Sequence, residues 1–178
     1  MYDRVTPQVA AERVERCGAG PVTAKSEPEL DLDVLVINVS GSVTDEQLTC
    51  IDKAASFYDV ELPASIQPRL DAIRKSRVDA AMAADGRKWL SEHKLLDRLP
   101  DYEPGVTQDA NFAHKIEELC KAPGALSSRY GLHTLNPDWI VRNSTFKSDG
   151  PLTCILNVTW ATGYQLGFIG NETYAPER

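Results

Sequence analysis

The chain has 178 residues, 42% of them hydrophobic and 25% charged, which is enough to bury the core of one globular domain. This composition excludes a disordered, collagen-like or coiled-coil protein. Its 26 acidic and 19 basic residues give a net charge of −7, which repels phosphate backbones, so we expect no nucleic-acid partner.

The first predicted elements are a helix and a β-hairpin. Thr6 is a typical N-cap and Pro7 a typical first helical residue, so we expect a helix at residues 7–17. Residues 21–41 have the pattern of two strands joined by a turn. The second of these strands, 32–40, is apolar on both faces, which indicates a central position in a sheet.

A long helical region follows the hairpin. Thr44 and Gln47 have the spacing of a capping box at the start of a helix. Apolar residues then recur at helical spacing in four stretches, which predicts a four-helix insertion over residues 44–121. Residues 122–137 are rich in Gly, Ser and Pro, so we expect a long loop there.

Residues 138–170 predict a three-stranded meander. In residues 152–160 the even positions are apolar and most of the odd ones are polar, as in a half-buried strand. The expected fold is a single α+β domain, 1–178, whose sheet has about five mostly antiparallel strands. In this arrangement the N-terminal hairpin and the meander form the sheet, and the four-helix insertion packs on one face.

The cysteines and asparagines indicate the compartment. The four cysteines include no Cys-x-x-Cys pair, so we expect either two disulfides, with three connectivities open, or four buried thiols. These residues are Cys17, Cys50, Cys120 and Cys154. Asn-x-Ser/Thr occurs four times, at Asn38, Asn143, Asn157 and Asn171. Both features favour a periplasmic or secreted protein over a cytoplasmic one, and the absence of a long apolar run predicts no membrane span.

Residues 33–48 form an apolar strand followed by a serine-containing loop. This segment resembles the first strand and loop of a von Willebrand factor A domain, whose Asp-x-Ser-x-Ser motif supplies oxygen ligands to Mg²⁺. The resemblance implies Asn38, Ser40 and Ser42 as metal ligands, with Asn38 in the place of the aspartate. The same residues also fit a strand-ending turn at Gly41, and the rest of the chain lacks the family's alternating strands and helices.

One basic cluster stands out in this acidic chain, formed by Arg69, Arg74, Lys75 and Arg77. Such a helix can dock phosphate or an acidic partner. Because acidic residues are interleaved with the basic ones, we expect an exposed helix face with ion pairs instead.

His133 and Trp139 are the remaining candidates for a site. His133 lies in the predicted loop and is the first choice for a general base, although no catalytic motif accompanies it. Trp139 follows the same loop and is either a contact residue or a core tryptophan. We therefore expect a small exported binding domain with no cofactor, whose partner is an unidentified protein or small molecule. The alternative is a metal-dependent or hydrolytic enzyme that uses Ser40, Ser42 and His133.

Overall fold

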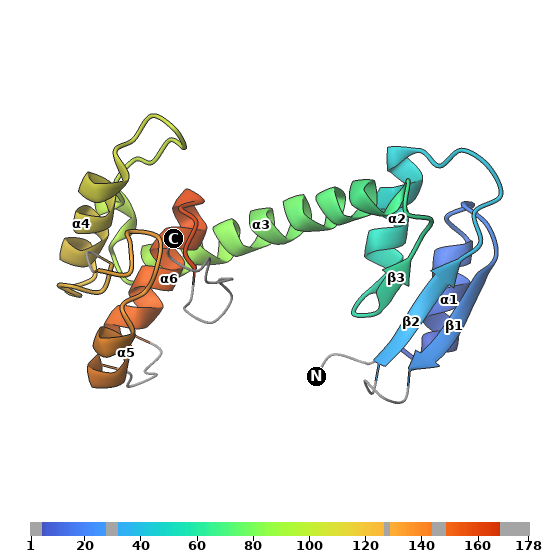
Figure 1. Cartoon of the computed structure of the whole chain (residues 1–178), viewed down its shortest axis with the longest axis horizontal. Helices are drawn as coiled ribbons and strands as arrows, with labels where there is room; N and C mark the ends of the chain where they lie inside the picture. The colour runs from blue at the N-terminus through green and yellow to red at the C-terminus, as the bar shows by residue number, and fades with distance from the viewer. Residues whose placement is uncertain (1–4, 28–31, 127–128, 144–148, 168–178) are drawn as a thin grey trace, which may run out of the picture. The chain divides into compact units, whose positions relative to one another are not determined.

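The computed structural model describes residues 5–27, 32–126, 129–143 and 149–167. The chain divides into two compact units, Met1–Val78 (unit 1) and Asp79–Arg178 (unit 2). The boundary falls within the long helix α3 (Gln67–Glu92; Figure 1). Each unit buries a hydrophobic core of its own.

Unit 1 combines helices with one small sheet. Before α3 it contains α1 (Pro7–Glu15), β1 (Val22–Glu27), β2 (Leu32–Ile37), α2 (Asp45–Ala55) and β3 (Asp59–Glu61). The strand order is β1-β2-β3, with β1 and β2 antiparallel and β2 and β3 parallel. Helix α2 connects the two parallel strands, as the crossover of a βαβ unit requires.

Local sequence signals account for the starts of α1 and α2. The Thr6 hydroxyl accepts a hydrogen bond from the Val9 amide at 3.4 Å, with Pro7 as the first helical residue. The Gln47 amide donates to the Thr44 hydroxyl at 3.2 Å, and the Thr44 amide donates to the Gln47 side chain at 3.0 Å. The predicted capping box is therefore confirmed.

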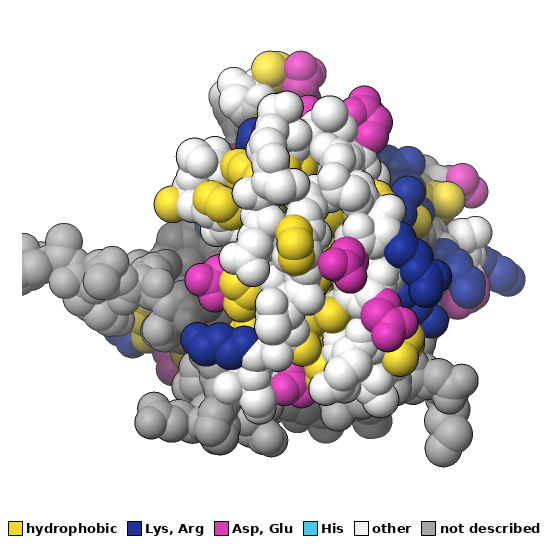
Figure 2. Space-filling view, turned by 90° about the vertical axis from the view of Figure 1, so that its right-hand side faces the viewer, with side chains coloured by type: hydrophobic (Ala, Val, Ile, Leu, Met, Phe, Trp, Pro, Cys, Tyr) yellow, Lys and Arg dark blue, Asp and Glu magenta, His cyan; other side chains and the backbone are white. Residues whose placement is uncertain are grey.

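Strand β2 is the middle strand of the sheet, as its apolar sequence predicts. Leu35 and Ile37 are buried in the core of unit 1, whereas Leu32 is 46% exposed. A disulfide between Cys17 and Cys50 joins the end of α1 to α2, with their Cα atoms 5.7 Å apart. Figure 2 views the side on which Figure 1 draws α1, β1 and β2, and shows hydrophobic side chains interspersed with charged ones. Charged groups therefore divide the apolar surface on this side.

Unit 2 is helical in the part of the chain that the structure describes. It contains the second part of α3, the 3-10 helix η1 (Leu96–Arg98), α4 (Asp109–Leu119), α5 (Pro137–Asn143) and α6 (Pro151–Thr162). Phe112, Leu126, Ile155 and Val158 are among the fully buried side chains of its core. A second disulfide, Cys120–Cys154, joins the end of α4 to α6.

The prediction of about five strands with a C-terminal meander was wrong. The sheet has three strands, and α5 and α6 occupy most of the described part of residues 138–170. Helix α6 is buried on most sides, so apolar residues at alternate positions do not distinguish it from a strand. Pro151 at its first turn and Gly163 after its last residue are the helix signals that the alternation concealed.

The prediction of a four-helix insertion on one face was also wrong. Strand β3 interrupts the helical region after α2, and the two helices expected next are one continuous helix, α3. Residues 44–121 also belong partly to unit 1 and partly to unit 2, so they do not form one layer on a single sheet. Three residues are too few for β3 to produce a recognisable alternation, and no proline separates the two apolar stripes within α3.

Gly86 lies where α3 packs closely against α6. A Cβ atom placed on it would be 2.6 Å from the Asn157 carbonyl oxygen and 3.1 Å from the Ala161 amide nitrogen. At a solvent-exposed position within a helix, Gly→Ala stabilises the protein by about 1 kcal/mol. Here we expect Gly86→Ala to destabilise the protein by about 1–3 kcal/mol, because the backbones must separate.

Urea denaturation measures the change in the free energy of unfolding on Gly86→Ala, and the sign of that change tests the prediction. Gly41→Ala is the matched control, since a Cβ at Gly41 meets nothing within 4 Å and should change stability little. A gain in stability on Gly86→Ala would contradict close packing of the two helices.

Candidate functional site

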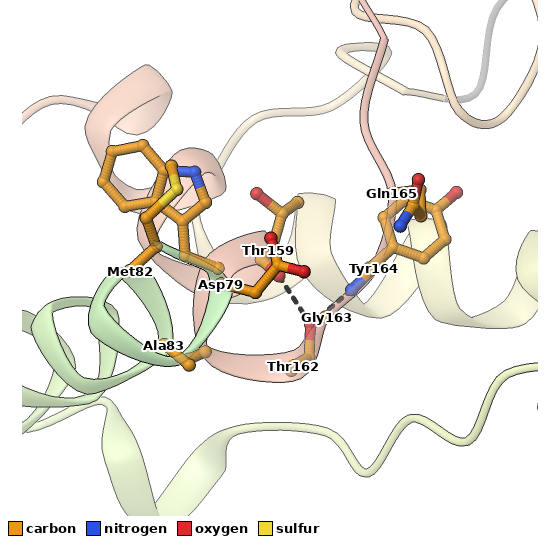
Figure 3. Close-up of a pocket in the computed structure, with 10 residues that line it drawn as sticks. Asp79, Met82, Ala83, Thr159, Thr162, Gly163, Tyr164 and Gln165 are labelled. Carbon is orange, nitrogen blue, oxygen red and sulfur yellow. Dashed lines mark hydrogen bonds between the residues drawn. The ribbon is translucent and has the colours of Figure 1, made fainter. Parts of the chain in front are cut away.

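A pocket of about 360 Å³ lies at the C-terminal end of α6 in unit 2 (Figure 3). It is lined by Asp79, Met82 and Ala83 of α3 and by residues 159–165. Helix α6 ends because Gly163 adopts a left-handed conformation, with φ of 74°, and its amide donates to the Thr159 carbonyl at 2.9 Å. The chain then turns away from the helix, and the space between this turn and α3 is the pocket. Its volume lies within the usual range for small-molecule sites.

The lining combines negative charge with apolar surface. The Asp79 carboxylate is exposed, and the C-terminal end of α6 carries the negative pole of the helix dipole. Met82 and Trp160 are half-buried and supply polarisable, apolar walls. Among the described residues that line the pocket there is no Lys, Arg or His. This combination suits a ligand with a cationic group and an apolar body.

Tyr164 forms a rigid wall of the pocket because its side chain is held on several sides. It is 3% exposed, and its hydroxyl donates to the Leu132 carbonyl at 2.5 Å. Its ring stacks on His133 at 4.7 Å between centroids and meets Tyr102 edge-on at 5.2 Å. Burial, with a smaller contribution from the charge of Asp109, raises the pKa of Tyr164 well above its ordinary value. The phenol therefore remains a hydrogen-bond donor at neutral pH.

His133, the predicted general base, has a side chain that is 46% exposed and stacks on the Tyr164 wall. Its Nε2 lies 3.0 Å from an oxygen of Asp109 and its Nδ1 lies 2.9 Å from the Gln165 carbonyl oxygen. The backbone beside it is tied as well, because the Gly167 amide donates to the His133 carbonyl at 2.6 Å. Both ring nitrogens are thus engaged, which makes this histidine a poor proton acceptor for a substrate.

Trp139, the other predicted contact residue, lies in the core of unit 2 and is 5% exposed. Its amide donates to the Asn136 side chain at 3.4 Å, and the same side chain accepts from the Asp138 amide at 3.0 Å. These contacts begin α5 in the manner of an N-cap. In the structure Trp139 is therefore a core residue of unit 2, which was one of the two interpretations of its sequence position.

The metal-ligand candidates lie in unit 1. Asn38, Ser40 and Ser42 are exposed residues of the loop between β2 and α2. Nowhere in the described residues do three His, Cys, Asp or Glu side chains gather in a group suited to a metal ion. His133 belongs to unit 2, so the enzyme hypothesis draws its residues from both units.

The pocket at α6 was not predicted, because residues 159–165 were expected to belong to the meander. Thr162 and Gly163 instead end α6. A helix ending at Gly163 would have placed Trp160 and Tyr164 near its C-terminus. The glycine, together with Pro151 at the helix start, was the available signal.

The chain was compared with protein-family models, with curated proteins and with solved structures. None of the three comparisons found a match. The site is therefore interpreted from its own geometry and chemistry.

The structure supports an oxidising environment for the chain. All four cysteines are paired, as Cys17–Cys50 and Cys120–Cys154, and disulfides persist in extracellular and periplasmic spaces. No described helix is long and apolar enough to cross a membrane.

The four Asn-x-Ser/Thr sites differ in accessibility. Asn38 is exposed, whereas Asn157 is 5% exposed in α6 and is therefore inaccessible to a modifying enzyme in the folded chain. The side chain of Asn143 donates to the Trp139 carbonyl at 2.8 Å. Asn171 lies outside the described residues.

Proposed function

We propose that this chain is an exported binding protein that holds a small cationic, partly apolar molecule in the pocket at the end of α6. The observation that carries the proposal is the composition of the pocket, in which Asp79 and the carboxyl end of a helix lie beside Met82 and Trp160. An ammonium group is attracted by both negative features and by the face of an indole ring. The paired cysteines support export.

The pocket favours binding over catalysis. Its lining offers a carboxylate, apolar surface and two threonine hydroxyls. Thr159 and Thr162 donate these hydroxyls to carbonyls of α6, at 2.9 and 2.8 Å, so their protons are directed to the helix backbone and not to a base. The nearby histidine is engaged through both nitrogens. Tyr164 is fixed by its hydrogen bond and ring contacts, so this wall is formed before a ligand arrives. Such preorganisation lowers the entropic cost of binding.

Calorimetric titration with butyltrimethylammonium tests this proposal. We expect Asp79→Asn and Trp160→Ala each to weaken binding about tenfold, equivalent to about 1.4 kcal/mol. Asp85→Asn is the matched control, because Asp85 is an exposed acid on the same helix that does not line the pocket. It should leave the affinity unchanged.

Butanol and pentanoate serve as the uncharged and anionic comparison ligands. Both are expected to bind much more weakly than the ammonium probe. Equal binding of butanol, or unchanged affinity in both pocket variants, would refute the assignment.

A further inference from the structure

A second pocket, of about 300 Å³, lies in unit 1 beside the end of α2. It is lined by Asp52, Lys53, Ser56, Phe57 and Arg77. Unlike the pocket at the end of α6, this pocket has more basic than acidic lining residues. Phe57 is 77% exposed, which is unusual for a large aromatic side chain and leaves an apolar surface at the rim.

Asp52 fixes the direction of the Arg77 guanidinium. The Asp52 side chain is 1% exposed, and its two oxygens accept from Arg77 Nε at 2.5 Å and from Arg77 Nη2 at 3.2 Å. Arg74 Nε donates to the same carboxylate at 3.2 Å. Burial raises the pKa of Asp52, but the hydrogen bonds and charges of Arg77 and Arg74 outweigh it, and the net pKa is lowered. The carboxylate therefore remains ionised and holds the arginine in one orientation.

The opposite edge of Arg77 is left for another oxyanion. Asp52 occupies the edge formed by Nε and Nη2, whereas Nη1 donates to no residue that the structure describes. The edge formed by Nη1 and the second hydrogen of Nη2 matches the two oxygens of a carboxylate or phosphate. The Arg77 side chain is 46% exposed, so a ligand can reach it.

Charge balance in the pocket favours an anion. Arg74 beside the pocket lies 3.8 Å from Asp59, and these two charges cancel. The lining carries two positive charges, on Lys53 and Arg77, and one negative charge, on Asp52. The C-terminal end of α2 opposes this with about half a negative charge, which is smaller than the excess. Attraction of an anion here is notable because the whole chain has a net charge of −7.

We propose that this pocket is a second ligand site, which takes a small oxyanion with an apolar or aromatic body. The oxyanion pairs with the outer edge of Arg77 and with Lys53, and the apolar body lies against Phe57. Asp52 is a positioning residue, because it acts on the ligand through Arg77.

Calorimetric titration with benzoate and phenyl phosphate at low ionic strength tests the proposal. We expect Lys53→Gln and Arg77→Lys each to weaken binding of the preferred probe about tenfold. Lysine at position 77 keeps the charge but loses the planar fork. Lys53 is exposed, so its substitution leaves the fold intact and keeps the test valid if the Arg77 variant is unstable.

Arg69→Gln is the matched control, because Arg69 is a partly exposed arginine of α3 that pairs with Asp45 and does not line the pocket. The Arg69→Gln variant should bind both probes with the affinity of the unchanged protein. Benzylamine, which is cationic, should not bind at this site. Inorganic phosphate should bind more weakly than phenyl phosphate, and Phe57→Ala should remove that difference. Failure of both aromatic probes to bind, or equal losses in the Arg69 and Lys53 variants, would overturn the proposal.

Discussion

Loss of the Cys120–Cys154 disulfide is expected to destabilise unit 2 by about 2–4 kcal/mol. The bond closes a loop with a sequence separation of 34 residues, so it removes much conformational freedom from the unfolded chain. Both cysteines are also buried, and α4 and α6 are joined directly by the bond. The Cys120→Ala, Cys154→Ala double variant removes it without leaving a reactive thiol.

Tryptophan fluorescence during urea denaturation is the measurement for this variant. Trp89, Trp139 and Trp160 are all the tryptophans of the chain, and all belong to unit 2. The fluorescence transition should therefore move to markedly lower urea concentration. The Cys17→Ala, Cys50→Ala variant is the matched comparison, since it removes a bond of nearly equal separation, 33 residues, from unit 1. An unchanged tryptophan transition in the first variant would show that this bond does not stabilise unit 2.

Phe112→Ala is expected to destabilise the protein by about 3–5 kcal/mol. The ring is 1% exposed and lies 4.5 Å from Tyr102 and 5.2 Å from Tyr164, measured between ring centroids. Its removal leaves a cavity beside the residue that forms the wall of the α6 pocket. Affinity for the ammonium probe should therefore fall along with stability.

Phe57→Ala provides the matched control for this truncation, because the Phe57 ring is 77% exposed. It should change the free energy of unfolding by no more than about 0.5 kcal/mol. Circular dichroism during urea denaturation reports both variants on one scale. Equal, small losses would mean that Phe112 is not in a packed core.

Local signals predicted those parts of the fold that depend on neighbouring residues. Thr6 with Pro7, and Thr44 with Gln47, fix helix starts through hydrogen bonds within one turn. The hairpin of β1 and β2 likewise forms between adjacent segments. Pairing of β2 with β3 was not predictable, because three residues carry too little pattern.

Whether the segment of α6 forms a helix or a strand depends on packing that a single sequence does not reveal. The segment contains several β-branched residues and alternating apolar positions, which favour a strand. Burial on most sides removes the polar face by which an amphipathic helix is recognised.

The candidate site was predicted only in part, for the same reason. His133 does lie next to the pocket wall, but its role there is visible only through Asp109 and Gln165, which are distant in sequence. The arginines of the basic cluster form ion pairs, as expected, but with Asp45 and Asp52 of α2 and with Asp59 of β3.

The two disulfides each close within one unit, at residues 17 and 50 and at residues 120 and 154. No covalent link other than the main chain therefore joins the parts of the chain on either side of Val78 and Asp79. A single cleavage between these two residues would leave two polypeptides that no disulfide joins. Each of the two would keep its own cross-link, so non-reducing electrophoresis under denaturing conditions would resolve them as two bands.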